Sequence, residues 1–60
     1  VIIKEQAFIG LNSTIRNNIT IGKGSIIGTA SNIVKNVDEY MVMMGNPAKP
    51  IGKDSRDIKL

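Results

Sequence analysis

The side chains that most often carry catalysis are missing from this sequence of 60 residues. The chain contains no histidine and no cysteine, which excludes the commonest general base, the commonest zinc ligand, thiolate metal sites and disulfides. Eight Lys and Arg against five Asp and Glu give a net charge of +3. This mild basic excess suits an anionic ligand but is too small to indicate nucleic-acid binding. We therefore predict no catalytic residue, no metal site and no nucleic-acid partner.

The composition favours a globular chain built from strands. Hydrophobic residues make up 42% and charged residues 22% of the chain, a balance typical of globular proteins and not of disordered ones. Isoleucine occurs eleven times against two leucines, and such an excess of β-branched residues favours strands. No apolar run approaches the roughly 18 residues that span a membrane, and there is no signal-peptide pattern. We predict a cytoplasmic, all-β protein, and we interpret the chain, which begins with Val1, as the C-terminal part of a longer protein.

A period of six residues is the most specific pattern in the sequence. When hexads are counted from Ile3, the first position is isoleucine in six consecutive hexads. These residues are Ile3, Ile9, Ile15, Ile21, Ile27 and Ile33. The second position is half glycine, the fifth is small or β-branched, and four of the six residues at the fourth are Asn or Gly, which readily take a left-handed backbone. The pattern predicts a short extended segment followed by a corner, repeated every six residues.

Three such corners bring the chain back above its start after 18 residues. Residues 3–20 and 21–38 then form two stacked triangular coils, about 4.8 Å apart. Each residue lies on the one 18 positions away, so the axis is filled by isoleucine on isoleucine, beginning with Ile3 on Ile21. A β-sandwich with an accidental period is the alternative, but it leaves the glycine and asparagine columns unexplained.

The same register makes two further predictions about stacked side chains. It places Ile19 on Val37 inside the column. It also places Asn18 on Asn36, which would form a short amide ladder along one corner, as in other stacked-strand structures.

The residues after the last hexad are expected to close one end of the column. We divide the chain into β-helix coils, residues 1–38, and a C-terminal cap and tail, residues 39–60. Within the cap, Tyr40–Met44 is predicted to lie as a strand beside the prism and Gly45–Pro47 to form a turn.

The two chain ends differ in what the sequence predicts for them. Asp54 is expected to cap a short helix whose Ile58 and Leu60 dock on the body, and a frayed terminus is the alternative. At the other end the coil near Ile3 has no capping segment, so it exposes an unpaired strand edge.

Three stretches of the chain resemble the hexapeptide-repeat acyltransferases. They are Phe8–Ile15 (FIGLNSTI), Ile19–Gly28 (ITIGKGSIIG) and Gly45–Lys49 (GNPAK). The match covers residues 3–51 and is closest to the sugar O-acetyltransferase branch, which includes sialic acid O-acetyltransferases and related amino-sugar N-acetyltransferases. The resemblance implies a left-handed parallel β-helix that assembles as a homotrimer. It also implies transfer of an acetyl group from acetyl-CoA to a hydroxyl or amine of a sugar or nucleotide-sugar, with a histidine as the base.

The resemblance assigns part of the acetyl-CoA groove to both coils. Ile27–Ser31 matches the family's Ile-Gly-Ala-Gly-Ser stretch, whose backbone meets the pantetheine arm, and it includes Gly28 and Thr29. Thr29 stands where the family usually has alanine, so a bulkier, polar side chain is expected to face the thiol-bearing arm. Leu11, one coil before Thr29, is expected to line the same groove.

Two lysines are the contacts that the resemblance implies for the nucleotide end, and Val34 beside one of them keeps the backbone of the family's motif. Val34-Lys35 matches the family's Thr-Lys pair, in which Lys35 keeps the charge for a CoA phosphate. Lys49 matches the basic residue of the GNPAK ending, which often reaches the nucleotide, and Pro50 replaces the usual β-branched residue. A solvated surface is the alternative for both lysines. The predicted acetyl-CoA residues are Leu11, Gly28, Thr29, Val34, Lys35 and Lys49.

The family's catalytic histidine has no counterpart in these residues. It usually lies one to two coils before the glycine-rich stretch, so we expect it before Val1 and expect the chain alone to be catalytically silent. The alternative function is a non-catalytic β-helix module that trimerises a nucleotidyltransferase, or a degenerate family member. A carbonic-anhydrase-like protein of the same repeat class is excluded because it needs histidine zinc ligands.

Overall fold

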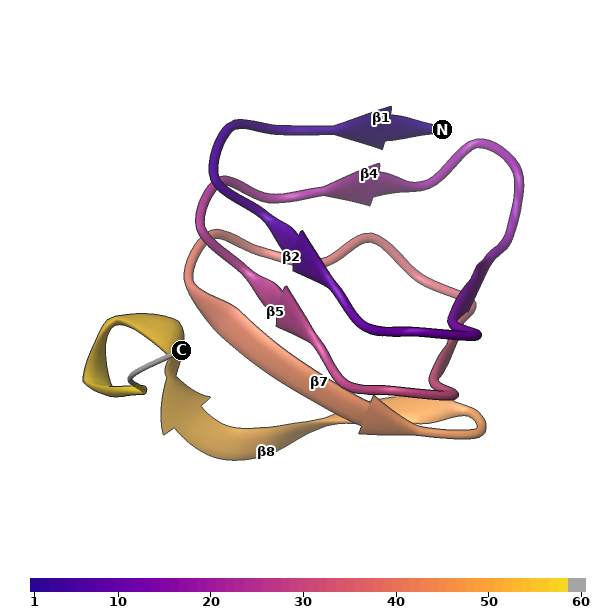
Figure 1. Cartoon of the computed structure of the whole chain (residues 1–60). Helices are drawn as coiled ribbons and strands as arrows, with labels where there is room; N and C mark the ends of the chain where they lie inside the picture. The colour runs from indigo at the N-terminus through magenta and orange to yellow at the C-terminus, as the bar shows by residue number, and fades with distance from the viewer. Residues whose placement is uncertain (59–60) are drawn as a thin grey trace.

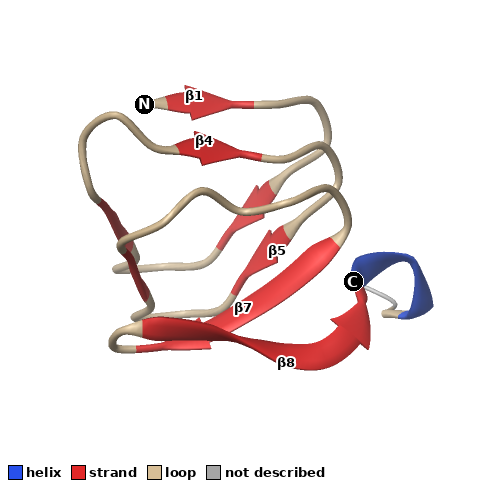
Figure 2. Cartoon of the chain, turned by 180° about the vertical axis from the view of Figure 1, so that it is seen from behind, coloured by secondary structure: helices blue, strands red, loops and turns tan. Residues whose placement is uncertain are grey.

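The chain winds into a three-sided column of short strands in the computed structural model, which describes residues 1–58 (Figures 1 and 2). β1 pairs with β4, β3 pairs with β6, and the third side has the order β2, β5, β7, β8. The elements are β1 (Ile2–Ile3), β2 (Phe8–Ile9), β3 (Thr14–Ile15), β4 (Thr20–Ile21), β5 (Ile26–Ile27), β6 (Asn32–Ile33), β7 (Met41–Gly45), β8 (Ala48–Asp54) and the 3-10 helix η1 (Ser55–Asp57).

The first two coils follow the predicted register of 18 residues. The three isoleucine pairs of the axis are all present in parallel strands: Ile3 with Ile21, Ile9 with Ile27, and Ile15 with Ile33. Backbone hydrogen bonds join the coils, such as the 2.8 Å bond from Gly10 N to Ile27 O. In each pair, the isoleucine of the second coil (Ile21, Ile27 or Ile33) is at most 1% exposed. The predicted triangular column is therefore confirmed, and burial of stacked isoleucines holds strands that are only two residues long.

The corners take the left-handed backbone at the predicted column. The fourth-position residues with φ between 58° and 67° are Gln6, Asn12, Asn18, Gly24 and Ala30. At the second position glycine is needed for close approach, because a Cβ on Gly22 would lie 2.5 Å from the carbonyl carbon of Asp38 in the next coil. Both glycine and asparagine columns thus have a direct steric cause.

The third coil is shorter than the sequence predicts. Val37 bridges to Ile21 in parallel, so the prediction that Val37 lies on Ile19 is wrong. The pairing is offset from the predicted register by the same number of residues in β7, where Met43 pairs with Ile27. Both pairs are 16 residues apart, against 18 between the first two coils.

The corner after β6 accounts for the two missing residues. Asn36 Oδ1 accepts a hydrogen bond from Thr20 N at 2.8 Å, and Val37 N donates to Thr20 O at 3.0 Å. The Asn36 side chain thus supplies the acceptor that a longer corner would supply from its backbone. The predicted ladder of Asn18 on Asn36 is wrong, because the Asn36 amide is turned toward Thr20.

The C-terminal hairpin is part of the column and not an addition beside it. β7 pairs parallel with β5 as a third layer, and β8 pairs antiparallel with β7 (Figure 2). The predicted strand Tyr40–Met44 is present one residue later, at Met41–Gly45, and it lies within the third side because of its pairing with β5. A turn at Asn46–Pro47 falls inside the predicted turn segment. The division of the chain at residue 38 remains a prediction.

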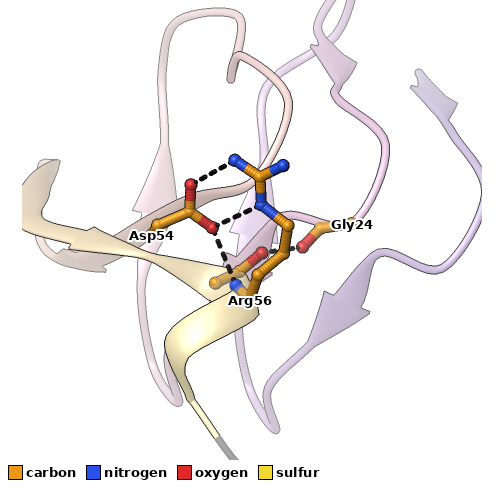
Figure 3. A network of polar contacts seen from close by, with 4 residues as sticks. Gly24, Asp54 and Arg56 are labelled. Carbon is orange, nitrogen blue, oxygen red and sulfur yellow. Dashed lines mark hydrogen bonds and ion pairs between the residues drawn. The ribbon is translucent and has the colours of Figure 1, made fainter.

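The tail begins with the predicted cap. Asp54 caps η1 by accepting a hydrogen bond from Arg56 N at 2.8 Å, and its carboxylate also pairs with the Arg56 guanidinium at 2.6 Å (Figure 3). The side-chain and backbone hydrogen bonds from Arg56 lower the pKa of Asp54 from 3.8 to about 2. The guanidinium lies 4.1 Å from the centre of the Tyr40 ring, a cation–π contact with the corner that begins β7.

A second contact ties the tail to the middle coil. Ser55 is buried, and its Oγ donates a hydrogen bond to the carbonyl oxygen of Gly24 (Figure 3). Ile58 is half-buried and donates its backbone N–H to Ser55 within the tail. The docking of Ile58 on the body remains a prediction. The predicted docking of Leu60 lies outside the described residues. Within residues 1–58 helical structure is limited to one 3-10 turn, and no helix is long and apolar enough to cross a membrane.

Candidate functional site

The predicted acetyl-CoA residues fall into two groups on the column. One group lies at the corner between β5 and β6 and at the corner above it: Leu11, Gly28 and Thr29. The other group lies around a cavity at the C-terminal end: Val34, Lys35 and Lys49. The side formed by β3 and β6 separates the corner group from Val34 and Lys35. Lys49 pairs with Met44, which lies beside Gly28, but none of the three corner residues lines the cavity.

The corner group presents two exposed side chains from successive coils. Leu11 is 80% exposed and Thr29 is also exposed. The coils are joined here by the 2.8 Å bond from Ala30 N to Leu11 O. An apolar and a hydroxyl-bearing side chain thus lie one coil apart on the surface, and the groove at this corner remains a prediction.

Both backbone polar groups of Gly28 already form hydrogen bonds within the column. Its N–H donates to Met43 O at 2.9 Å, and its carbonyl accepts from Ser13 Oγ at 2.8 Å. A Cβ at this position would lie 2.8 Å from Cγ of Met44. Met44 is 50% exposed, so its side chain can move away from an added Cβ. The contact of Gly28 with pantetheine remains a prediction that rests on the second lone pair of its carbonyl.

A cavity of about 330 Å³ opens at the C-terminal end of the column. Its size is at the lower end of pockets that bind small molecules. The isoleucine axis ends here, so the cavity has an apolar floor formed by Ile33, Val37, Met41 and Met43. Val34, Lys35 and Lys49 line the same cavity. Val34 and Lys35, in the corner after β6, and Lys49, in β8, therefore line one cavity.

The charges around the cavity favour an anion. Lys35 and Lys49 are exposed at its edge, and Asp38 is the one carboxylate among its lining residues. Lysine ammonium groups suit phosphate oxygens as mobile point charges. Among residues 1–58, no group of three or more His, Cys, Asp or Glu could hold a metal ion. The site as described can bind an anionic ligand with an apolar portion, and it contains no histidine that could act as base.

A line of polar side chains was missed by the sequence prediction. Thr14 Oγ1 donates to Asn32 Oδ1 at 2.9 Å, and Asn32 Nδ2 donates to Asn46 Oδ1 at 3.1 Å. We call Thr14, Asn32 and Asn46 the polar ladder. Thr14 and Asn32 share the sixth position of their hexads, so this half could have been read from the register. Asn46 could not, because the shortened coil and the hairpin decide where it lies.

The comparisons with known proteins agree on one kind of enzyme. No protein-family model matches the chain. A probable macrolide acetyltransferase of Lysinibacillus sphaericus is 42% identical over 59 residues, which cover 98% of this chain and 33% of the relative. The serine acetyltransferase of Neisseria gonorrhoeae has a TM-score of 0.84 at 34% identity, over 97% of this chain and 21% of that one.

A third relative carries the repeat in its name. It is a hexapeptide-repeat acetyltransferase of Vibrio cholerae, solved with acetyl coenzyme A, with a TM-score of 0.84 at 26% identity over 88% of this chain and 28% of that one. The chain thus spans between about a fifth and a third of the length of these relatives. The shared fold confirms the predicted left-handed parallel β-helix. By sequence and by fold, the chain belongs to the hexapeptide-repeat acetyltransferases.

Proposed function

We propose that this chain is the acetyl-CoA-binding part of an acetyltransferase whose acceptor is a hydroxyl or amine of a sugar or nucleotide-sugar. The observation that carries the proposal is the cavity that gathers Val34, Lys35 and Lys49 over an apolar floor. The phosphates of CoA would meet the two ammonium groups, and the pantetheine arm would run toward the corner of Leu11 and Thr29. The relative of Vibrio cholerae that was solved with acetyl coenzyme A supports this choice of ligand.

The reaction defines what the rest of the protein must supply. The acceptor oxygen or nitrogen attacks the thioester carbonyl, the new bond to carbon forms, the carbon–sulfur bond breaks, and CoA leaves as the thiol after taking a proton. A base must remove the acceptor proton, and a donor must stabilise the oxyanion. Since these residues include no histidine, we propose that the base comes from another part of the protein or from a neighbouring copy in a homotrimer.

The choice of a sugar acceptor rests on the resemblance to sugar O-acetyltransferases. The names of the relatives include macrolide and serine acetyltransferases, so acceptors differ while the CoA-binding coils are shared. Acceptor contacts are therefore expected outside the cavity described above.

Calorimetric titration of the chain with CoA tests the proposal. Lys35→Ala and Lys49→Ala should each weaken CoA binding about three- to tenfold, because each removes one exposed charge–phosphate contact worth roughly 1 kcal/mol. Lys53→Ala is the matched control, since Lys53 is an exposed lysine on β8 that does not line the cavity. Unchanged affinity in both cavity variants, or an equal loss in the control, would contradict the proposed phosphate site.

A further inference from the structure

We propose that the polar ladder of Thr14, Asn32 and Asn46 binds the amide groups of the pantetheine arm; this inference rests on the proposed function. The arm is neutral and carries secondary amides, each with one donor and one acceptor. The lysines suit phosphates, whereas the ladder offers only neutral hydroxyl and carboxamide groups. The two parts of the ligand therefore have separate, chemically matched parts of the surface.

The ladder lies between the corner group and Lys35. Asn32 is in β6, three residues after Thr29 and three before Lys35. At about 3.3 Å per residue, each separation is at most about 10 Å. Asn46, at the lower end of the ladder, directly precedes Pro47, which lines the cavity. A linear ligand that reaches from the corner to Lys35 therefore crosses β6, where Asn32 lies.

The hydrogen bonds of the ladder all run in one direction. Thr14 donates to Asn32, and Asn32 donates to Asn46, so the donor groups point toward the cavity end. The last donor, Asn46 Nδ2, has no acceptor among residues 1–58 in the hydrogen bonds of the structure. Aligned hydrogen bonds polarise one another and strengthen the donor at the end of the chain. A carbonyl oxygen of the ligand is the natural acceptor for it.

The exposure of the ladder leaves it accessible to a ligand. Thr14 and Asn46 are exposed, and Asn32 is half-buried. Because the ladder is built across two coils and the hairpin, its spacing is fixed by the backbone and not by flexible side chains. Such a pre-formed row of amide groups lowers the ordering penalty for a flexible arm.

Titrations with two probes test the inference. The probes are CoA and adenosine 3′,5′-bisphosphate, the nucleotide part that lacks the pantetheine arm. Asn46→Ala and Asn32→Ala should each weaken CoA binding about 2- to 10-fold, the range for one hydrogen bond between neutral groups, and should leave binding of the nucleotide unchanged. Asn17→Ala, at an exposed asparagine outside the ladder, is the control and should change neither. Melting curves show that each variant is folded.

The possible outcomes separate the two proposals. If the wild-type chain binds both probes and the ladder variants bind CoA as tightly as wild type, the ladder inference is overturned and the cavity stands. Equal losses for both probes also overturn it, because the ladder would then contact the nucleotide or act only through the fold. If the wild-type chain binds neither probe, the proposed function itself fails.

Discussion

The two ends of the column differ in how they finish the same repeat. At the N-terminal end, β1 leaves an unpaired edge on which Ile2 and Ile3 are 60% and 50% exposed. At the C-terminal end, the hairpin turns the chain antiparallel, and its outer strand β8 carries Lys49, Pro50 and Lys53. Proline and lysine on an outer strand discourage further strand pairing. The edge of β1 is therefore uncovered in this structure, whereas the edge at β8 is protected against further strand pairing.

This difference shows that the repeat motif does not by itself create a core. Ile3 and Ile21 occupy the same hexad position and pair with each other, yet one is half-exposed and the other is fully buried. A residue becomes core only when a layer lies on both sides of it, which is the nearest-neighbour behaviour of repeat proteins. The shortened third coil is thus what completes the burial of the second coil.

Truncating the paired isoleucines of the first and second coils should give the largest difference in stability. Ile21→Ala should lower the free energy of unfolding by about 2–5 kcal/mol, as expected for a fully buried isoleucine that leaves a cavity. Ile3→Ala should lower it by about 1 kcal/mol or less, because half of that side chain is already in water. Urea denaturation measures both. Equal losses would show that the bare end is covered in solution.

Adding a methyl group to the contact between the second and third coils should have the next largest effect. Gly22→Ala places a Cβ 2.5 Å from the backbone of Asp38 and should lower stability by roughly 3 kcal/mol, the upper part of the range for overpacking. Gly52→Ala in the hairpin meets nothing within 4 Å and has φ of +79°, so only backbone strain of about 1 kcal/mol is expected. Thermal unfolding that ranks them in the opposite order would disprove the tight contact.

Protonation of Asp54 in its ion pair with Arg56 should have the smallest effect on stability. The lowered pKa of Asp54 means that its ion pair stabilises the fold above about pH 3.8 and that this contribution is lost as the pH falls toward about 2. Asp54→Asn keeps a capping oxygen and removes the charge, so the melting temperature of wild type should approach that of the variant over this pH range. A constant difference from pH 5 to pH 2 would contradict the assigned pair.

The column could be predicted because its cause is local and periodic. The isoleucine, glycine and asparagine positions each answer a steric demand that recurs every six residues. The shortened coil could not be predicted in this way, since it involves a hydrogen bond that the Asn36 side chain accepts from Thr20 N in the preceding coil. The conformation of Tyr40, a bulky residue at φ of +57°, could not be predicted either, because its ring contacts Arg56, which is 16 residues later in the sequence.

The site was predictable only in part for the same reason. Lys35 and Lys49 could be chosen by their resemblance to family motifs, but their meeting at one cavity depends on where the hairpin folds back. The link from Asn32 to Asn46 joins the regular coil to that hairpin. Contacts between residues that follow the repeat of six can be predicted from their spacing in the sequence. Contacts between the regular coils and the hairpin cannot, because the hairpin does not follow the repeat.

The antiparallel hairpin also decides how this chain can polymerise. A filament of stacked columns needs two receptive ends on every copy, so that each added unit presents a new place for growth. Here the reversal of direction at β8, with its proline, removes one of them. A further coil stacked on this end would meet a strand that runs in the opposite direction to the coils, so the parallel stacking of the column stops at the hairpin.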